Sequence, residues 1–177
     1  MREGFQGIHV VPYRRIERRF RRLSITSVVF SGAIFGFFYA WVCSTMWGLD
    51  RTDPRVAIAA MQAMNASVRN AVFFPAFFLT PAVLGVTAAA ARFSGRGAAA
   101  FWFCAAAAVY LVFGLMLTFT VNVRMNEALA ATAVPGDIAA ARDIWRDYSQ
   151  RWQVWNQARA LASGTALAFA ALGVARL

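Results

Sequence analysis

The sequence contains no lysine, one histidine and two cysteines among its 177 residues. All 18 basic side chains are therefore arginine, and they outnumber 8 acidic ones. The single histidine, His9, has no neighbouring cysteines and carboxylates at metal-binding spacing, and there is no glycine-rich phosphate loop or Ser-His-Asp set. These absences argue against metal, haem and nucleotide chemistry, so we expect no cofactor.

What the sequence has in abundance is apolar residues. Hydrophobic residues make up 60% of the chain, charged residues only 15%, and the mean hydropathy is +0.52, well above that of a soluble domain. The net charge of +10 is compatible with nucleic-acid binding, but the arginines lie in short stretches between long apolar runs rather than on one basic face. We expect a membrane protein without a nucleic-acid partner, and the alanine-rich, lysine-free composition suggests a bacterial one.

Four stretches are apolar and long enough, or nearly so, to cross a bilayer, which takes about 20 residues. They cover residues 24–47, 70–91, 98–121 and 158–174. The sequence thus predicts an all-α fold, an integral membrane four-helix bundle over residues 24–177 preceded by a basic tail, residues 1–23. Cys43 and Cys104 fall near opposite ends of their spans, so we expect two free thiols.

Arginine is distributed unevenly over the flanks of these spans. Seven arginines against two acids give the first 23 residues a net charge of +5, and Arg92, Arg96 and Arg176 lie in the other short flanks. The two longer connections balance their arginines with acids. The positive-inside rule then places both termini in the cytoplasm and the protein in the inner membrane, where lipid is its first partner.

Two short amphipathic helices are expected on the outer side. Asp53 and Pro54 form a typical helix start for residues 54–69. An aromatic stripe at helical spacing runs into the fourth span and comprises Trp145, Tyr148, Trp152, Trp155 and Arg159.

Helix packing within the membrane has two sequence signals. Gly32 and Gly36 form a small-x-x-x-small step that favours close helix packing and would allow a homo-oligomer. Pro75 and Pro81 are expected inside the second span, each bending it.

Polar residues from separate segments are predicted to meet at the outer mouth of the bundle. The set consists of Asn65, Asn70, Asn122, Asn126, Glu127, Asn156 and Arg159. Ordinary roles remain open for its members, because Asn commonly caps helices and Arg159 could snorkel to the headgroups. The tryptophans could equally form an interfacial belt.

Three blocks of this set resemble one protein family. Met61-Gln62-Ala63-Met64-Asn65 with Asn70, then Asn122-x-x-x-Asn126-Glu127, then Trp152-x-x-Trp155-Asn156-x-x-Arg159 are similar to the anthrone-oxygenase-like family of small four-span membrane proteins. The resemblance covers roughly residues 25–175. This chain departs from the family pattern at Arg124, where a proline is common, and at Gln157, where a histidine is common and would be the obvious general base.

The resemblance implies cofactor-independent oxidation of an apolar aromatic molecule, an anthrone or polyphenol, by O2. Arg159 would stabilise the substrate anion, and Glu127 is the remaining candidate base. Amides would hold the substrate oxygens, with Asn156 assigned to the catalytic residues beside Arg159 and Glu127 and four others to substrate binding: Asn65, Asn70, Asn122 and Asn126. Trp152 and Trp155 would stack on its rings.

A non-catalytic function fits the same residues. The protein could bind a lipid or quinone-like molecule, or support a partner protein, without turnover. In that case replacing Arg159 would disturb binding or assembly and change no product.

Overall fold

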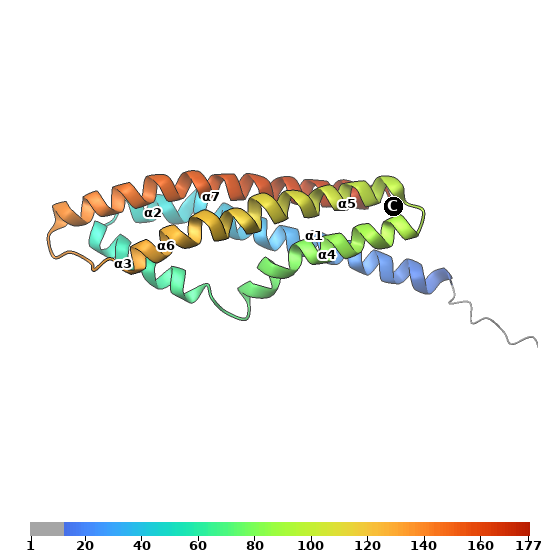
Figure 1. Cartoon of the computed structure of the whole chain (residues 1–177), viewed down its shortest axis with the longest axis horizontal. Coiled ribbons are helices and arrows are strands. Elements are labelled where there is room, and N and C mark those ends of the chain that lie inside the picture. The colour runs from blue at the N-terminus through green and yellow to red at the C-terminus, as the bar shows by residue number, and fades with distance from the viewer. Residues whose placement is uncertain (1–12) are drawn as a thin grey trace, which may run out of the picture.

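The computed structural model describes residues 13–177, so His9 and the first half of the basic tail lie outside the described residues. These residues form an elongated, all-α bundle, as predicted (Figure 1). In chain order the helical segments are α1 (Tyr13–Ala40), η1 (Trp41–Thr45), α2 (Met46–Asp50), α3 (Pro54–Ser67), α4 (Phe73–Phe93), α5 (Gly97–Val109), η2 (Tyr110–Met116), η3 (Thr118–Asn122), α6 (Val123–Ala130) and α7 (Ile138–Val174). The segments η1, η2 and η3 are π-helical turns inside otherwise continuous helices.

Three helices in residues 13–177 are long and apolar enough to cross a membrane: Glu17–Asp50, Phe73–Phe93 and Gly97–Ala130. The helical membrane character expected from the sequence is therefore confirmed. The fourth helix, α7, packs against α1 and α5 and returns the chain to the end where α1 begins (Figure 1). A crossing by residues 158–174 of α7 stays a prediction.

The helices are longer than the predicted spans. Residues 13–23 belong to α1, so the described part of the basic tail is helical. The aromatic stripe and the fourth stretch form one helix of 37 residues, α7, because no proline or glycine lies between Asp137 and Gly164 to interrupt it. Asp137 caps its start by accepting a hydrogen bond from the backbone N–H of Ala140.

The connection between α3 and α4 corrects one expectation. The Asp53 cap of α3 is confirmed, since its carboxylate accepts from the Arg55 N–H at 2.9 Å. Asn70 then caps α4, accepting from the backbone N–H of Val72 and Phe73. Because α4 begins at Phe73 rather than at residue 70, Pro75 lies in its first turn, where the missing N–H matters little. Only Pro81 is inside the helix.

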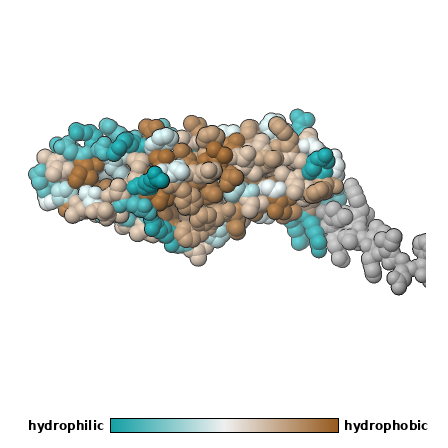
Figure 2. Space-filling view, in the orientation of Figure 1, coloured by the Kyte–Doolittle hydropathy of each residue, from teal (hydrophilic) through white to brown (hydrophobic). Residues whose placement is uncertain are grey.

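The bundle divides into two halves along its axis. The 21 residues of α4 span about 31 Å, close to the roughly 30 Å of a hydrocarbon core. We call residues 24–40, 73–117 and 158–174 the membrane half. Residues 41–67 and 123–157 extend beyond α4 and form the outer half. Figure 2 shows apolar residues around the middle of the molecule and hydrophilic residues at both ends.

Glycine serves close packing at other positions than predicted. A Cβ on Gly36 would meet nothing within 4 Å, and one on Gly32 would only touch Leu167 at 4.0 Å. In contrast, a Cβ on Gly173 would lie 2.9 Å from the Phe103 ring, and one on Gly164 3.0 Å from Phe35. The tight glycine contacts between helices therefore come from α7, and Gly114 in η2 lies against the Tyr110 ring of its own helix. Cys43 and Cys104 are free, as predicted, and exposed on the helix surface.

Candidate functional site

A cavity of about 320 Å³ lies where the membrane half meets the outer half. This volume is at the lower end of the range for small-molecule sites, ~300–1,000 Å³. Five helices and the α3–α4 connection contribute to its walls, which are mostly aromatic. The lining residues are Phe37, Phe38, Trp41, Met64, Asn65, Val68, Arg69, Phe73, Phe74, Phe77, Phe78, Thr118, Phe119, Val123, Asn126, Glu127, Trp152 and Arg159.

Arg159 is the buried cation of this cavity, with 5% of its surface exposed. Its guanidinium carbon lies 4.5 Å from the centre of the Phe38 ring and 5.4 Å from that of Trp152. Such positions over aromatic faces stabilise a cation by about 0.5–2 kcal/mol. None of the ion pairs formed within residues 17–177 involves Arg159.

The hydrogen bonds of Arg159 leave part of it unsatisfied. Nη2 donates to the Asn156 Oδ1 at 2.8 Å, and Nη1 donates to the Thr118 hydroxyl at 3.4 Å. The buried Nε–H has no partner among the described residues. A guanidinium carries more donors than these two bonds use, so Arg159 can still donate to a ligand.

Asn156 holds Arg159 in place from outside the cavity. It is 1% exposed, and its amide nitrogen donates to the Phe38 carbonyl at 3.2 Å. Both ends of the amide are thereby used, one on α1 and one on the guanidinium. The structure thus brings Asn156 to Arg159, while the cavity lining does not include it.

Asn126 anchors a second polar group of the cavity. The Trp152 indole N–H, which can only donate, bonds to the Asn126 Oδ1 at 3.0 Å, and the Tyr148 hydroxyl donates to the same oxygen at 2.8 Å. Asn65 donates in turn to the Tyr148 oxygen at 3.4 Å. The Asn126 amide nitrogen makes no hydrogen bond within residues 13–177 and is free to donate to a ligand.

Tyr148 strengthens this arrangement by staying protonated. Burial raises the pKa of Tyr148 above its usual range, since removing the hydroxyl from water disfavours the phenolate. The hydroxyl is protonated at neutral pH even in an exposed tyrosine, burial extends this to more alkaline pH, and its bond to Asn126 fixes the orientation of that amide.

Glu127 lies at the rim of the cavity rather than next to Arg159. Its carboxylate is 3.8 Å from the Arg69 guanidinium, and both side chains are more than half exposed. The pair connects the end of α3 to α6 across the cavity edge. Glu127 is thus the one carboxylate in the cavity lining.

Besides Asn156, three predicted site residues are not part of the cavity wall. Asn70 caps α4 and lines a neighbouring groove. Asn122 is fully buried, and neither end of its amide has a partner among the described residues. Trp155 is 40% exposed, because it lies at the edge of the stripe whose centre Trp152 occupies.

The aromatic residues of α1, η1 and α4 were missed by the sequence reasoning. Phe37, Phe38 and Trp41 lie in the first span, and four phenylalanines within residues 73–78 begin the second. Their apolar character was attributed to the membrane alone. The concentration of phenylalanine at one depth was the available signal.

The chemistry that this site offers is that of amides, indoles, one carboxylate and two arginines, of which Arg159 is buried and Arg69 is exposed. Within the described part of the chain, no three His, Cys, Asp or Glu side chains converge on one point where a metal ion could bind. A flat aromatic ligand with an anionic oxygen would match both the ring-lined walls and the free donors of Arg159 and Asn126.

Comparison with known proteins identifies the family. No curated protein and no solved structure matches the chain. The anthrone oxygenase family matches it over residues 63–169, more than half of its length. The matched region includes the polar residues of the cavity, Asn65, Asn126, Glu127 and Arg159. The chain belongs to the anthrone oxygenase family.

Proposed function

We propose that this protein oxidises an apolar aromatic carbon acid of the anthrone type with O2, in the cavity and without a cofactor. The observation that carries the proposal is Arg159, a buried guanidinium without a carboxylate partner in the described chain, facing a cavity with aromatic walls. Burying a cation without a counter-ion is costly, so an anionic ligand would recover part of that free energy.

The reaction begins with loss of a proton. Removing one proton from the central CH2 of an anthrone gives an anion whose charge rests largely on the oxygen of the carbonyl group opposite that carbon. Arg159 favours this anion electrostatically, as preorganised donors do in other enzymes. Glu127 is the base within the lining, and Asn126 donates to a phenol oxygen where the substrate carries one. Exclusion of water by the aromatic walls increases both effects.

Oxygen then completes the four-electron oxidation. The carbanion transfers one electron to O2, the resulting radical and superoxide combine, and protonation gives a hydroperoxide on the central carbon. Loss of the second C–H proton breaks the O–O bond and expels hydroxide, which takes up that proton to form water. The balance is anthrone plus O2 giving anthraquinone plus H2O, so O2 is the only oxidant needed.

The test uses membranes containing the protein and an anthrone in air-saturated buffer. Oxygen uptake and quinone absorbance are followed together, with empty membranes measuring spontaneous oxidation and a chelator testing for adventitious metal. We expect acceleration that survives chelation. For Arg159→Met, kcat/KM should fall roughly 10²–10³-fold, as when an oxyanion donor is removed.

The matched control is Arg124→Met, which removes an arginine of the outer half that does not line this cavity. It should retain wild-type activity, and Arg159→Lys should fall between the two because it keeps the charge and loses the fork of donors. Saturable binding of an anthrone without turnover would instead indicate the non-catalytic alternative, a membrane protein that binds a quinone-like molecule.

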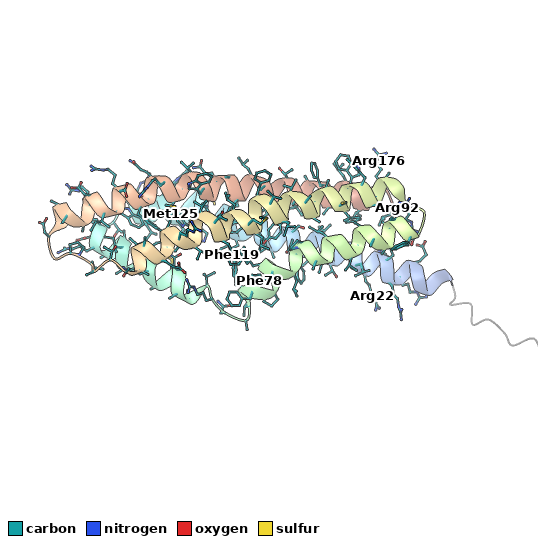
Figure 3. All side chains as sticks on the ribbon, in the orientation of Figure 1. Arg22, Phe78, Arg92, Phe119, Met125 and Arg176 are labelled. Atoms are coloured by element: carbon teal, nitrogen blue, oxygen red, sulfur yellow. The ribbon has the colours of Figure 1, made fainter. Side chains whose placement is uncertain are left out.

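We further propose that both termini are cytoplasmic and that the cavity faces the outer leaflet of the inner membrane. Arg22, Arg92 and Arg176 gather at the end of the bundle where α1 begins and α7 finishes (Figure 3). This distribution supports that orientation through the positive-inside rule. Labelling of cysteines introduced at Arg176 and at Asp143 from opposite sides of the membrane tests it.

A further inference from the structure

The wall of the cavity between α4 and the helix from Gly97 to Ala130 differs from the other walls. These two helices pack closely over α5 and much less over η2 and η3, so they diverge toward the outer end. The Tyr110 hydroxyl donates to the Phe77 carbonyl at 2.8 Å and joins them at the inner end of the wedge. Beyond this bond, aromatic side chains fill the space between the helices.

Phe78 and Phe119 stack on each other in that wedge, and the buried Phe77 ring packs edge-on against both. The centroids of Phe78 and Phe119 are 5.9 Å apart and the rings are nearly parallel, at 29°. Both line the cavity, and Phe78 is 41% and Phe119 45% exposed. Figure 3 shows them together between α4 and the neighbouring helix. Each ring therefore has cavity on one side and the surroundings of the protein on the other.

The surroundings at this depth are hydrocarbon. Phe78 is five residues inside the start of α4, or roughly 8 Å along the helix. The edge of the cavity that is nearer to water is the one bridged by Arg69 and Glu127. Glu127 lies eight residues beyond Phe119, roughly 12 Å further out. The cavity thus has an apolar side toward lipid and an ionic side toward water.

We propose that Phe78 and Phe119 form a lateral passage through which the apolar aromatic substrate moves between the outer leaflet and the cavity. This rests on the proposed function for the class of ligand. Partly exposed side chains change rotamer on the ps–ns timescale, so the two rings can part without a change in the backbone. Their flat faces match a planar ligand better than they match lipid chains. The edge bridged by Arg69 and Glu127 is the alternative route, from water.

The test measures binding rather than turnover, so that it does not depend on the proposed chemistry. The probe is anthracene-2-carboxylate, a planar anion without the oxidisable CH2 of an anthrone. The full chain is placed in lipid vesicles, and tryptophan quenching follows the association and dissociation rate constants of the probe. Trp41 and Trp152 line the cavity and report its occupancy. Binding should saturate and should weaken in Arg159→Met.

A passage and a simple contact predict different rate changes. If the rings obstruct the path, Phe78→Ala and Phe119→Ala should raise both rate constants by roughly ten-fold, a change within the range that association rates span among related sites. The dissociation constant, which is the ratio of the two, should stay nearly unchanged. If the rings only contact the ligand, the dissociation rate alone should rise. That second result, in both variants, would overturn the proposal.

Two control variants locate the passage. Phe73→Ala opens the other lipid-facing wall, where the Phe37 and Phe73 rings lie 4.7 Å apart and separate the cavity from a groove between α1 and α4. Glu127→Gln breaks the ion pair on the aqueous side. Neither control variant should raise the association and dissociation rate constants together. If Phe73→Ala or Glu127→Gln raised both rate constants while Phe78→Ala and Phe119→Ala did not, the lateral passage would be contradicted.

The failures of the two proposals are distinguishable. Gated probe binding with no anthrone oxidation would leave the passage intact and reject the oxygenase. Anthrone oxidation at rates unaffected by Phe78→Ala and Phe119→Ala, with probe kinetics also unaffected, would reject the passage alone. Absence of saturable probe binding to the wild type would count against the passage for this class of ligand.

Discussion

The two halves of the bundle have apolar cores of different composition, mostly alanine and phenylalanine in the membrane half and side chains such as methionine and tryptophan in the outer half. Ile34, Leu84 and Phe103 are fully or almost fully buried in the membrane half, as are Ile58 and Met61 in the outer half. Outside the membrane, water surrounds the packed helices, so burial of apolar area stabilises them directly. In the membrane, lipid is as apolar as the core, and helix association depends on close fit. A buried apolar side chain therefore contributes differently in the two halves.

The two halves also differ in how side-chain hydrogen bonds connect their helices. In the outer half, Asp50 alone accepts bonds from Trp145, Ser149 and Gln153, at 3.0, 2.6 and 2.9 Å. In the membrane half, the hydroxyls mostly bond to the backbone of their own helix, with Ser27 to Thr87 at 2.9 Å as a bond between helices. The outer half thus joins its helices through clustered side-chain bonds, whereas the membrane half has isolated ones, such as Ser27 to Thr87 and Tyr110 to Phe77, and depends more on close fit.

The largest expected effect compares Ile58→Ala with Leu84→Ala, two changes at positions with no exposed surface. Ile58→Ala should lower the free energy of unfolding by about 2–5 kcal/mol. Leu84→Ala should lower the free energy of unfolding by less. Unfolding in an apolar medium does not transfer the leucine side chain to water, so the variant loses only packing contacts. Unfolding by SDS titration in micelles, followed by circular dichroism, measures both. Equal losses would remove the distinction between the halves.

Close fit in the membrane half is tested by two glycine-to-alanine changes. Gly173→Ala places a Cβ against the fully buried Phe103 ring and should destabilise by about 1–3 kcal/mol. Gly36→Ala meets open space and should stabilise by about 0.5–1 kcal/mol, because alanine favours the helix. The opposite signs are the informative result in the same SDS titration. A loss of stability in both variants would show that Gly36 also serves packing, as in a homo-oligomer.

Side-chain bonding in the outer half is tested at Asp50. Asp50→Leu leaves three donors without their acceptor and should lower the free energy of unfolding by about 1–3 kcal/mol. The control Asp143→Leu removes an exposed ion pair with Arg146 and should change it by less than about 0.5 kcal/mol. Chemical denaturation followed by near-ultraviolet circular dichroism reports on Trp145 in both. If Asp50→Leu did not change the free energy of unfolding, burial of the apolar cluster would be the main source of stability in the outer half.

The smallest expected effect is confined to the first turn of α3. Hydrogen bonds from Arg55 hold the pKa of Asp53 at about 2, below its ordinary value of 3.8. The cap therefore stabilises the folded state above about pH 4, and this contribution is lost as the pH falls toward 2. Hydrogen exchange of the α3 amides, corrected for its intrinsic pH dependence, should accelerate in that window. Asp53→Ser, which caps without titrating, should not show this acceleration.

The sequence was informative wherever one residue type has one physical consequence. Apolar length predicted the helices, and the Asp53 and Pro54 pair predicted the start of α3 to the residue. Helical spacing placed Trp152 and Arg159 on one face, and the structure brings Asn126 to them. Long-range contacts that depend on helix rotation were less accessible. Trp155 shares the stripe but lies outside the cavity, because a small angular offset on α7 decides exposure.

The positions of Asn122 and Asn126 show why the parts of the site that depend on helix rotation were not predictable. Four residues apart, they were expected on a common face, yet Asn122 is buried and only Asn126 lines the cavity. The π-helical turns η2 and η3 lie between α5 and these two amides and set the rotation of both about the helix axis relative to α5. Hydropathy does not distinguish a π turn from an α turn, so the rotation became visible only in three dimensions.

These π turns also constrain how the protein can change over evolutionary time. A π turn contains about one residue more than the α turn it replaces, so deletion of a single codon within residues 110–122 could restore a plain α-helix there. Such a deletion would leave the rotation of α6 relative to α5 nearly unchanged, because the α turn covers the same angle with one residue fewer. A one-residue deletion in the α-helical part between Gly97 and Val109 would instead turn everything after it by about 100° and take Asn126 and Glu127 out of the cavity. The π turns are therefore the segments of this helix that can lose a residue and keep Asn126 and Glu127 in the cavity.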